Sequence, residues 1–352
     1  MSRVTAGAPP LPSASHRPAP HPDAEDDRLH PCIAPLAALA GCNGKTEGGG
    51  AGKVFRIAVI PKGTSHEFWK SVERGARRAD TELADVEIVW KGPTGEGDAN
   101  QQIQIVESFL ADGYDGICLA PLDARALETP VRQAAAKKVP VVIFDSGLAS
   151  ADAPIASYVA TNNVHGGELA GEHLATLLGN KGNVVLIPYA VGSESTEQRE
   201  RGFLDNMKKH PDIKILSSDK HGGPDESHAI EVSENLLATF GEKIDGIFCS
   251  NESSTSGLLT VLRRDPRGLA GKIKVVGFDS SGNIVKGLQD GVLHGVVLQD
   301  PVKMGYESVK AIRAKLLGEP VAKRIETGET LVTPQNMGEP RHHELLFPLE
   351  KK

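Results

Sequence analysis

From Val54 onward, short apolar runs alternate with longer stretches that mix apolar and polar positions. Apolar runs of about four to eight residues are typical of buried strands, and longer stretches with an apolar stripe are typical of helices. The pattern predicts strands over residues 54–60, 86–90, 116–120 and 139–144. Helices are predicted between them, over residues 67–83, 99–111 and 124–137. Strands that alternate with helices of this length indicate parallel βαβ units.

The same series recurs further along the chain, with strands predicted over residues 184–188, 213–217, 246–250 and 273–278. Ile60-Pro61 and Ile187-Pro188 are separated by 127 residues, as are Glu73-Arg74-Gly75 and Glu200-Arg201-Gly202. The run 141–146 matches the run 275–280 at a separation of 134 residues. Because the separation grows so little, we expect two similar lobes with small insertions. The period is too long for a solenoid repeat.

Two such lobes would face each other across a cleft. In open parallel α/β sheets, ligands bind outside the carboxyl ends of the strands, and a cleft between two lobes can close by a hinge motion. The residues that follow the predicted strands are mostly polar, with a few aromatic side chains among them. Short carboxylates and amides match adjacent hydroxyl groups, and an aromatic ring can lie on the apolar face of a sugar. This combination favours a small polyhydroxy ligand over a fat or a nucleic acid.

Several motifs follow one another in a characteristic order: Ser65-His-Glu-Phe-Trp69, Asn162-Asn-x-x-Gly-Gly167, Arg199-x-x-Gly-Phe203, Val275-Val-Gly-Phe-Asp279 and Leu298-Gln-Asp300. In this order the chain, from about Val54 to Val332, resembles the periplasmic sugar-binding proteins of the ribose/galactose type, which are substrate-binding components of ABC importers. The resemblance implies the type I periplasmic-binding-protein fold, in which two doubly wound parallel-sheet lobes are joined by a hinge.

The resemblance also implies a role for individual residues. Phe68 and Trp69 would sandwich the sugar from one lobe, with Phe278 near it from the other. Asp145 and Asp279 would accept hydrogen bonds from hydroxyl groups. The remaining implied ligand-binding residues are His66, Thr161 and Asn163 in the first lobe, Arg199 and Asn251 in the second, and Gln299 at the hinge.

Other interpretations of these residues stay open. Phe68 and Trp69 could be core residues of a helix, and Arg199 could be a solvated helix residue. Asp145, Asp279 and Asn251 could each cap a helix, which short polar side chains do well.

Three departures from the ribose-binding pattern leave the ligand open. Ser146 stands where an Arg is usual, Ala120 where an Asn is usual, and His66 where another Asn is usual. A site built to pair hydroxyl groups strongly rejects a ligand that leaves its polar groups unpaired. Besides ribose, the candidates are therefore another pentose, a hexose, a deoxy sugar or a polyol.

Composition excludes several other classes. The chain has 352 residues, with 39 Lys and Arg against 46 Asp and Glu, so its formal net charge is −7. An acidic chain without a basic block is poorly suited to bind nucleic acid. The chain has no apolar stretch long enough to span a membrane. Its four Cys residues lack metal-ligand spacing, so we expect no metal and no cofactor.

The first fifty residues differ from the rest. Residues 1–31 are expected to be a disordered leader. Residues 32–42 end in Leu39-Ala40-Gly41-Cys42, which resembles the lipobox of a bacterial lipoprotein signal, although a chance match in an Ala-rich tail is the alternative. The resemblance implies that Cys42 carries a lipid and that residues 43–53 are a flexible tether. The protein would then lie in the periplasm or on the outer face of the cytoplasmic membrane.

The boundaries expected for the body follow from the repeat. The N-terminal lobe should comprise residues 54–162 and 300–328, and the C-terminal lobe residues 163–299 and 329–340, with a tail over 341–352.

The predicted function is an extracytoplasmic solute-binding protein, monomeric and without enzyme activity. It would capture a monosaccharide or polyol and deliver it to the permease subunits of an ABC importer. One alternative is a sugar-sensing input for a chemoreceptor or transcription regulator, although no helix-turn-helix pattern precedes the body. The other is an α/β enzyme that acts on a sugar, although the chain lacks a G-x-S-x-G, an H-E-x-x-H and a G-x-G-x-x-G after a strand.

Overall fold

The fold was obtained as a computed structural model, which describes residues 53–350. The predicted leader, lipobox and most of the predicted tether, Cys42 included, lie outside the described residues. Within residues 53–350, no helix is both long and apolar enough to cross a membrane.

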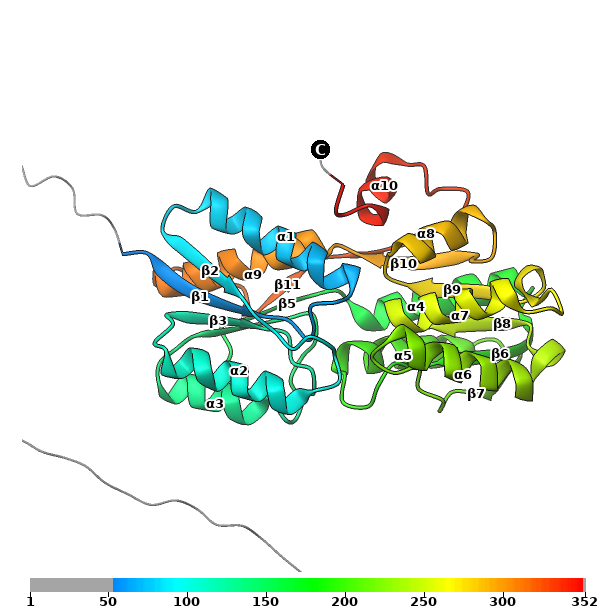
Figure 1. The fold of residues 1–352 in the computed structure, drawn as a ribbon, viewed down its shortest axis with the longest axis horizontal. Helices are drawn as coiled ribbons and strands as arrows, with labels where there is room; N and C mark the ends of the chain where they lie inside the picture. The colour runs from blue at the N-terminus through cyan, green and yellow to red at the C-terminus, as the bar shows by residue number, and fades with distance from the viewer. Residues whose placement is uncertain (1–52, 351–352) are drawn as a thin grey trace, which may run out of the picture. The chain divides into compact units, whose positions relative to one another are not determined.

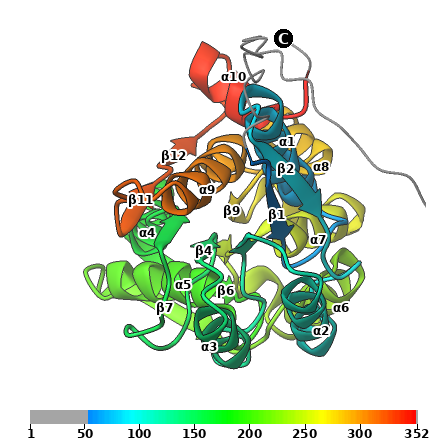
Figure 2. The ribbon, with the colours of Figure 1, turned by 90° about the vertical axis from the view of Figure 1, so that its left-hand side faces the viewer.

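The N-terminal lobe is built on a six-stranded sheet whose neighbouring strands are all parallel, in the order β11-β5-β4-β3-β1-β2. Its strands are β1 (Phe55–Ile60), β2 (Val86–Trp90), β3 (Gly116–Leu119), β4 (Val141–Phe144), β5 (Ser157–Ala160) and β11 (Arg324–Glu326). Its helices are α1 (Glu67–Glu82), α2 (Ala99–Ala111), α3 (Glu128–Ala136) and α9 (Pro301–Leu316). Helices α1 and α9 cover one face of the sheet, and α2 and α3 cover the other (Figures 1 and 2).

The C-terminal lobe repeats this arrangement, with the sheet order β12-β10-β9-β8-β6-β7. Its strands are β6 (Lys181–Ile187), β7 (Asp212–Ser217), β8 (Gly246–Cys249), β9 (Lys274–Phe278), β10 (Gly295–Gln299) and β12 (Glu329–Val332). Its helices are α4 (Asn163–Leu177), α5 (Glu194–Met207), α6 (Glu226–Thr239), α7 (Glu252–Arg264), α8 (Gly282–Gln289) and α10 (Pro340–Leu346), with short 3-10 helices at Gly241–Lys243 and Leu269–Gly271. The edge strand β12 is antiparallel to β10. The predicted fold of two similar doubly wound lobes is confirmed.

Most predicted elements form close to their expected ends. The third helix begins at Glu128 rather than at residue 124, because the chain first makes a turn. Strands β5, β10, β11 and β12 were not predicted. Each lies outside the two matching series of four strands that the repeat indicated.

The chain crosses between the lobes three times: after β5, after β10, and between β11 and β12. The buried Thr161 of the first crossing contacts one buried residue from each of the other two. The Thr161 hydroxyl donates to Gln299 Oε1 at 2.7 Å and lies 3.4 Å from the hydroxyl of Thr327. In this hinge, the hydroxyl group of Thr161 contacts residues of both other crossings.

The segment predicted as a tail contains the helix α10. Leu346 is buried in the core of the C-terminal lobe, and the Ser280 hydroxyl donates to its carbonyl oxygen at 2.7 Å. Beyond α10, the guanidinium of Arg74 on α1 donates to the carbonyl oxygens of Pro348 and Glu350. The segment therefore contacts both lobes.

Glycine lets one pair of helices in each lobe approach closely. A Cβ atom at Gly75 of α1 would lie 1.9 Å from the carbonyl oxygen of Val302 on α9. In the other lobe, a Cβ at Gly202 of α5 would lie 2.1 Å from the carbonyl oxygen of Val164 on α4. Gly75 and Gly202 are partners in the repeat, so both halves use the same packing device.

Gly75→Ala should lower the free energy of unfolding by about 1–3 kcal/mol, because overpacking forces the backbones of α1 and α9 apart. Urea denaturation of the unliganded protein measures this. Gly271→Ala is the matched control, since a Cβ there meets nothing within 4 Å. Equal stability of the two variants would contradict the packing argument.

Candidate functional site

A cleft lies between the carboxyl ends of the two sheets. Eight of the predicted binding residues line it: His66, Phe68, Trp69, Asp145, Arg199, Asn251, Asp279 and Gln299. Six lining residues were not among the predicted ones: Lys62, Glu96, Tyr189, Ser195, Thr196 and Glu252. Both lobes contribute to the wall, as expected for a cleft that closes by hinge motion.

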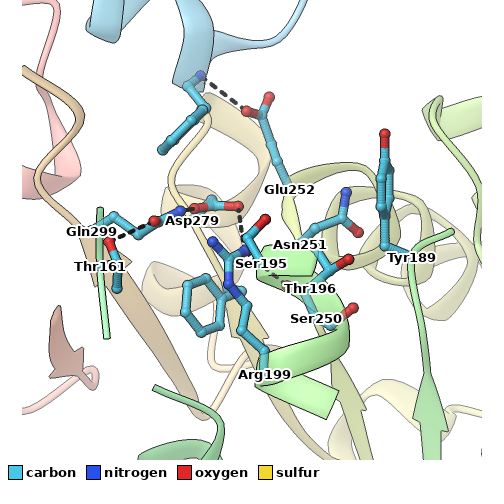
Figure 3. Close-up of polar contacts among 12 residues, drawn as sticks. Thr161, Tyr189, Ser195, Thr196, Arg199, Ser250, Asn251, Glu252, Asp279 and Gln299 are labelled. Carbon is cyan, nitrogen blue, oxygen red and sulfur yellow. Dashed lines mark hydrogen bonds and ion pairs between the residues drawn. The ribbon is translucent and has the colours of Figure 1, made fainter. Parts of the chain in front are cut away.

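The other three predicted residues lie behind the lining and support it: Thr161, Asn163 and Phe278. Thr161 holds Gln299, and Gln299 Nε2 in turn donates to Asp279 Oδ1 at 2.6 Å (Figure 3). Asn163 Oδ1 accepts from Arg199 Nε at 2.8 Å. The guanidinium carbon of Arg199 lies 3.9 Å from the centroid of the Phe278 ring. These contacts fix the direction in which Arg199 and Gln299 face the cleft.

Asp145 and Asp279 occupy equivalent places at the ends of β4 and β9. Both have left-handed backbone conformations, with φ of 61° and 69°. Each backbone N–H still donates to the neighbouring strand, Asp145 to Val159 and Asp279 to Val297, both at 3.0 Å. Neither caps a helix, since the cap of α8 is Ser281. The turn directs both carboxylates toward the cleft.

Asn251 combines both roles considered for it. Its Oδ1 accepts from the backbone N–H of Ser254 at 3.3 Å, which caps α7, and the residue also lines the cleft.

Each cation that lines the cleft has a carboxylate partner. Lys62 Nζ lies 3.2 Å from Asp145 Oδ2, and Arg199 Nη1 lies 3.7 Å from Asp279 Oδ2. His66 Nδ1 lies 2.6 Å from Glu96 Oε1. The cleft is thus rich in charge, but its cations are compensated by the protein itself.

These pairs shift several pKa values. Burial disfavours the charged form of His66, but the hydrogen bond to Glu96 and the negative charges around His66 together outweigh it and raise the pKa of His66 to about 9. Burial likewise opposes ionisation of Glu96, yet the hydrogen bond from His66 and the positive charges of His66 and Lys62 together lower the pKa of Glu96 to about 2. For Asp279, burial raises the pKa despite the nearby Arg199.

Direct hydrogen bonds cross the cleft and hold the lobes in a closed arrangement. Glu252 of α7 accepts from the backbone N–H groups of Glu67 and Phe68 at 3.2 and 3.1 Å. Lys62 Nζ donates to the hydroxyls of Ser193 and Ser195 at 3.0 and 3.3 Å.

Residue 146 is Ser rather than the usual Arg, and a Lys from another loop supplies the cation beside Asp145. The cation beside Asp145 is Lys62, which comes from the loop after β1. The Ser146 hydroxyl oxygen instead accepts from the backbone N–H of Ser195 at 3.0 Å, across the cleft.

Three of the unpredicted residues carried a sequence signal. Lys62 and Tyr189 each follow an Ile-Pro pair and are separated by 127 residues, so they are partners in the repeat. Glu252 directly follows the predicted Asn251. Glu96 lies in a loop between β2 and α2 that has neither periodicity nor a repeat partner of its type, so nothing in the sequence indicated it.

The model of the periplasmic binding protein domain family matches residues 57–320. The chain belongs to this family. A D-ribose/D-allose-binding protein of Pseudomonas aeruginosa is 30% identical over 269 residues, which cover 75% of this chain and 83% of the relative. The predicted family and the predicted function of an extracytoplasmic sugar-type solute-binding protein are confirmed.

Solved structures agree with this assignment. A carbohydrate transporter solute-binding protein from Agrobacterium radiobacter, in complex with D-arabinose, has a TM-score of 0.79 at 34% identity, covering 84% of this chain and all of its own. An ABC transporter solute-binding protein from Agrobacterium vitis with bound D-fucose has a TM-score of 0.79 at 32% identity, covering 83% of this chain and 99% of its own.

The buried carboxyl group of Glu252 should make folding stability depend on pH. Burial raises the pKa of Glu252 to about 7, above its ordinary value near 4.5. Its stabilising contribution is therefore full below about pH 4.5 and is lost as the pH rises through 7. As the pH rises from 4.5 to above 7, the unfolding free energy of Glu252→Gln should therefore increase by roughly 3 kcal/mol relative to that of the parent protein.

Denaturation of the unliganded proteins between pH 4.5 and 8 measures this difference. Glu231→Gln, on an exposed position of α6, is the control and should follow the parent at every pH. Parallel curves for Glu252→Gln and the parent would refute the assignment.

Proposed function

We propose that the protein captures an uncharged monosaccharide or polyol in the cleft and delivers it to the permease subunits of an ABC importer. The observation that carries the proposal is the pairing of Lys62, His66 and Arg199 with carboxylates of the protein itself. A charged ligand would displace one member of a pair and leave a buried charge without a partner, which is strongly destabilising. A neutral hydroxyl-rich ligand can bond to the remaining lone pairs and N–H groups of the pairs without breaking them.

The walls of the cleft support the same class of ligand. Phe68 and Trp69 supply an aromatic surface, and Asp145, Asp279 and Asn251 supply hydrogen-bonding groups. The relatives described above are named for D-ribose and D-allose or hold D-arabinose and D-fucose, which are all neutral sugars. We infer that this chain takes a ligand of that size and acts on it only by binding.

The proposal extends to location and partners. We propose that Cys42 is the lipid-bearing residue of a lipoprotein signal, that residues 43–53 tether the body to the membrane, and that the protein acts as a monomer. The lobe boundaries proposed from the repeat, 54–162 with 300–328 and 163–299 with 329–340, remain part of this proposal.

A thermal-shift panel of D-ribose, D-allose, D-arabinose, D-fucose and xylitol should contain at least one compound that raises the Tm. Asp279→Asn should then lower the affinity for that compound about 10- to 100-fold, because a hydrogen bond to a charged group contributes roughly 1.5–3 kcal/mol. Asn is chosen since it tolerates the left-handed backbone at this position. Calorimetric titration measures the affinity.

The control is Asp152→Asn, on an exposed loop residue. Chromatography of the ligand after incubation tests whether the protein only binds it, and an altered compound would indicate an enzyme instead. Unchanged affinity in Asp279→Asn would contradict the site.

Cys42→Ser should abolish incorporation of a labelled fatty acid and shift the protein from the membrane fraction to the soluble fraction. Cys118→Ser is the control, because Cys118 is buried in β3. Persistent labelling of Cys42→Ser would refute the lipobox.

A further inference from the structure

Glu96 is a residue of the cleft that contacts side chains from both lobes. Its Oε1 atom lies 2.7 Å from Trp69 Nε1 and 2.6 Å from His66 Nδ1. Its Oε2 atom accepts from the Tyr189 hydroxyl at 2.7 Å. Trp69 and His66 belong to the N-terminal lobe, whereas Tyr189 follows β6 of the C-terminal lobe. One buried carboxylate therefore joins both walls of the cleft.

The two carboxylate oxygen atoms of Glu96 contact different lobes: Oε1 contacts the N-terminal lobe and Oε2 the C-terminal lobe. Oε1 fixes the indole of Trp69, which contacts Phe68 edge to face at 4.8 Å, and so orients the aromatic wall formed by Phe68 and Trp69. The backbone of Gly63 packs closely against the Glu96 side chain, since a Cβ at Gly63 would lie 2.8 Å from Glu96 Cγ. These N-terminal contacts lie within one lobe, so they do not require closure.

The contact of Oε2 differs in this respect. The Tyr189 hydroxyl reaches Glu96 only when the lobes are together, because it is carried by the opposite lobe. A hydrogen bond to an ionised acceptor is stronger than one between neutral groups. The Tyr189–Glu96 bond thus stabilises the closed form, and its acceptor is the group that orients the aromatic wall.

We propose that Glu96 is a positioning residue that couples the orientation of the aromatic wall to lobe closure. This inference rests on the proposed function, since the aromatic wall is taken as the surface on which the ligand lies. A ligand that lies on that wall leaves Glu96 in position to accept the hydrogen bond from the Tyr189 hydroxyl. This bond then stabilises the closed complex. A compound that displaces Trp69 or His66 also displaces the acceptor of the cross-lobe bond, so the complex closes less firmly.

The first test removes only the hydroxyl. Tyr189→Phe should increase the dissociation constant about tenfold for whichever compound of the panel (D-ribose, D-allose, D-arabinose, D-fucose or xylitol) stabilises the parent, mainly through faster dissociation. The association rate should stay unchanged, because the bond forms only once the lobes are together, which separates closure from a merely structural role. Tyr306→Phe is the matched control, because it removes a Tyr–Glu hydrogen bond of the same 2.7 Å length, to Glu82 within one lobe.

The second test needs no sugar. The chain has two Trp residues, so a Trp90→Phe background leaves Trp69 as the sole indole fluorophore. In that background, Glu96→Ala should shift the Trp69 emission and lower its anisotropy, and Glu96→Gln, which keeps an acceptor oxygen, should restore most of both.

If Tyr189→Phe released the ligand no faster than Tyr306→Phe, the proposed coupling between Glu96 and lobe closure would be overturned. Emission in Glu96→Ala that equals that of its background would overturn the positioning role. If the parent itself bound no compound of the five-member panel, the proposed function would fail, while the emission comparison would still decide the role of Glu96.

Discussion

The requirement that buried cations be paired governs the cleft of this protein. Lys62, His66 and Arg199 each face a carboxylate, and the pairs are drawn from loops and helices that follow different strands. Removing water from such groups is unfavourable unless each has a partner. The pairing lets the lobes approach until Lys62 and Glu252 bond directly to the opposite lobe. It also means that the cleft presents polar atoms to a ligand while demanding no charge from it.

The hinge and the cleft are parts of one hydrogen-bonded chain. Thr161 joins the three crossings and donates to Gln299, and Gln299 donates to Asp279. Asp279 in turn lies beside Arg199, whose position is set by Asn163 and Phe278. A movement at the crossings is therefore transmitted to the carboxylate and guanidinium that face the ligand, through contacts that all lie within the buried part of the molecule.

The sequence predicted most of the fold because buried parallel strands are nearly continuous apolar runs, and the repeat gave a second, independent view of each. This argument did not predict the short edge strands β11 and β12. Arg324-Ile-Glu, for example, contains no run of apolar residues. At the site, Asp145 and Asp279 were found because they end matching strands. Lys62 and Tyr189 could have been predicted in the same way, because each follows the end of a matching strand. Glu96 was not, because a loop residue acquires its role only from the side chains that the fold places around it.

The left-handed turn at Asp145 and Asp279 restricts how this scaffold can diversify. Of the common residues, only Gly, Asn and Asp adopt that conformation readily. Each strand end can therefore offer an acceptor, an amide or an empty space, and little else. New ligand preferences on this frame would have to arise at less constrained backbone positions, such as Lys62, His66 and Glu252, while the two turns preserve a fixed reference point for whatever small molecule the lobes enclose.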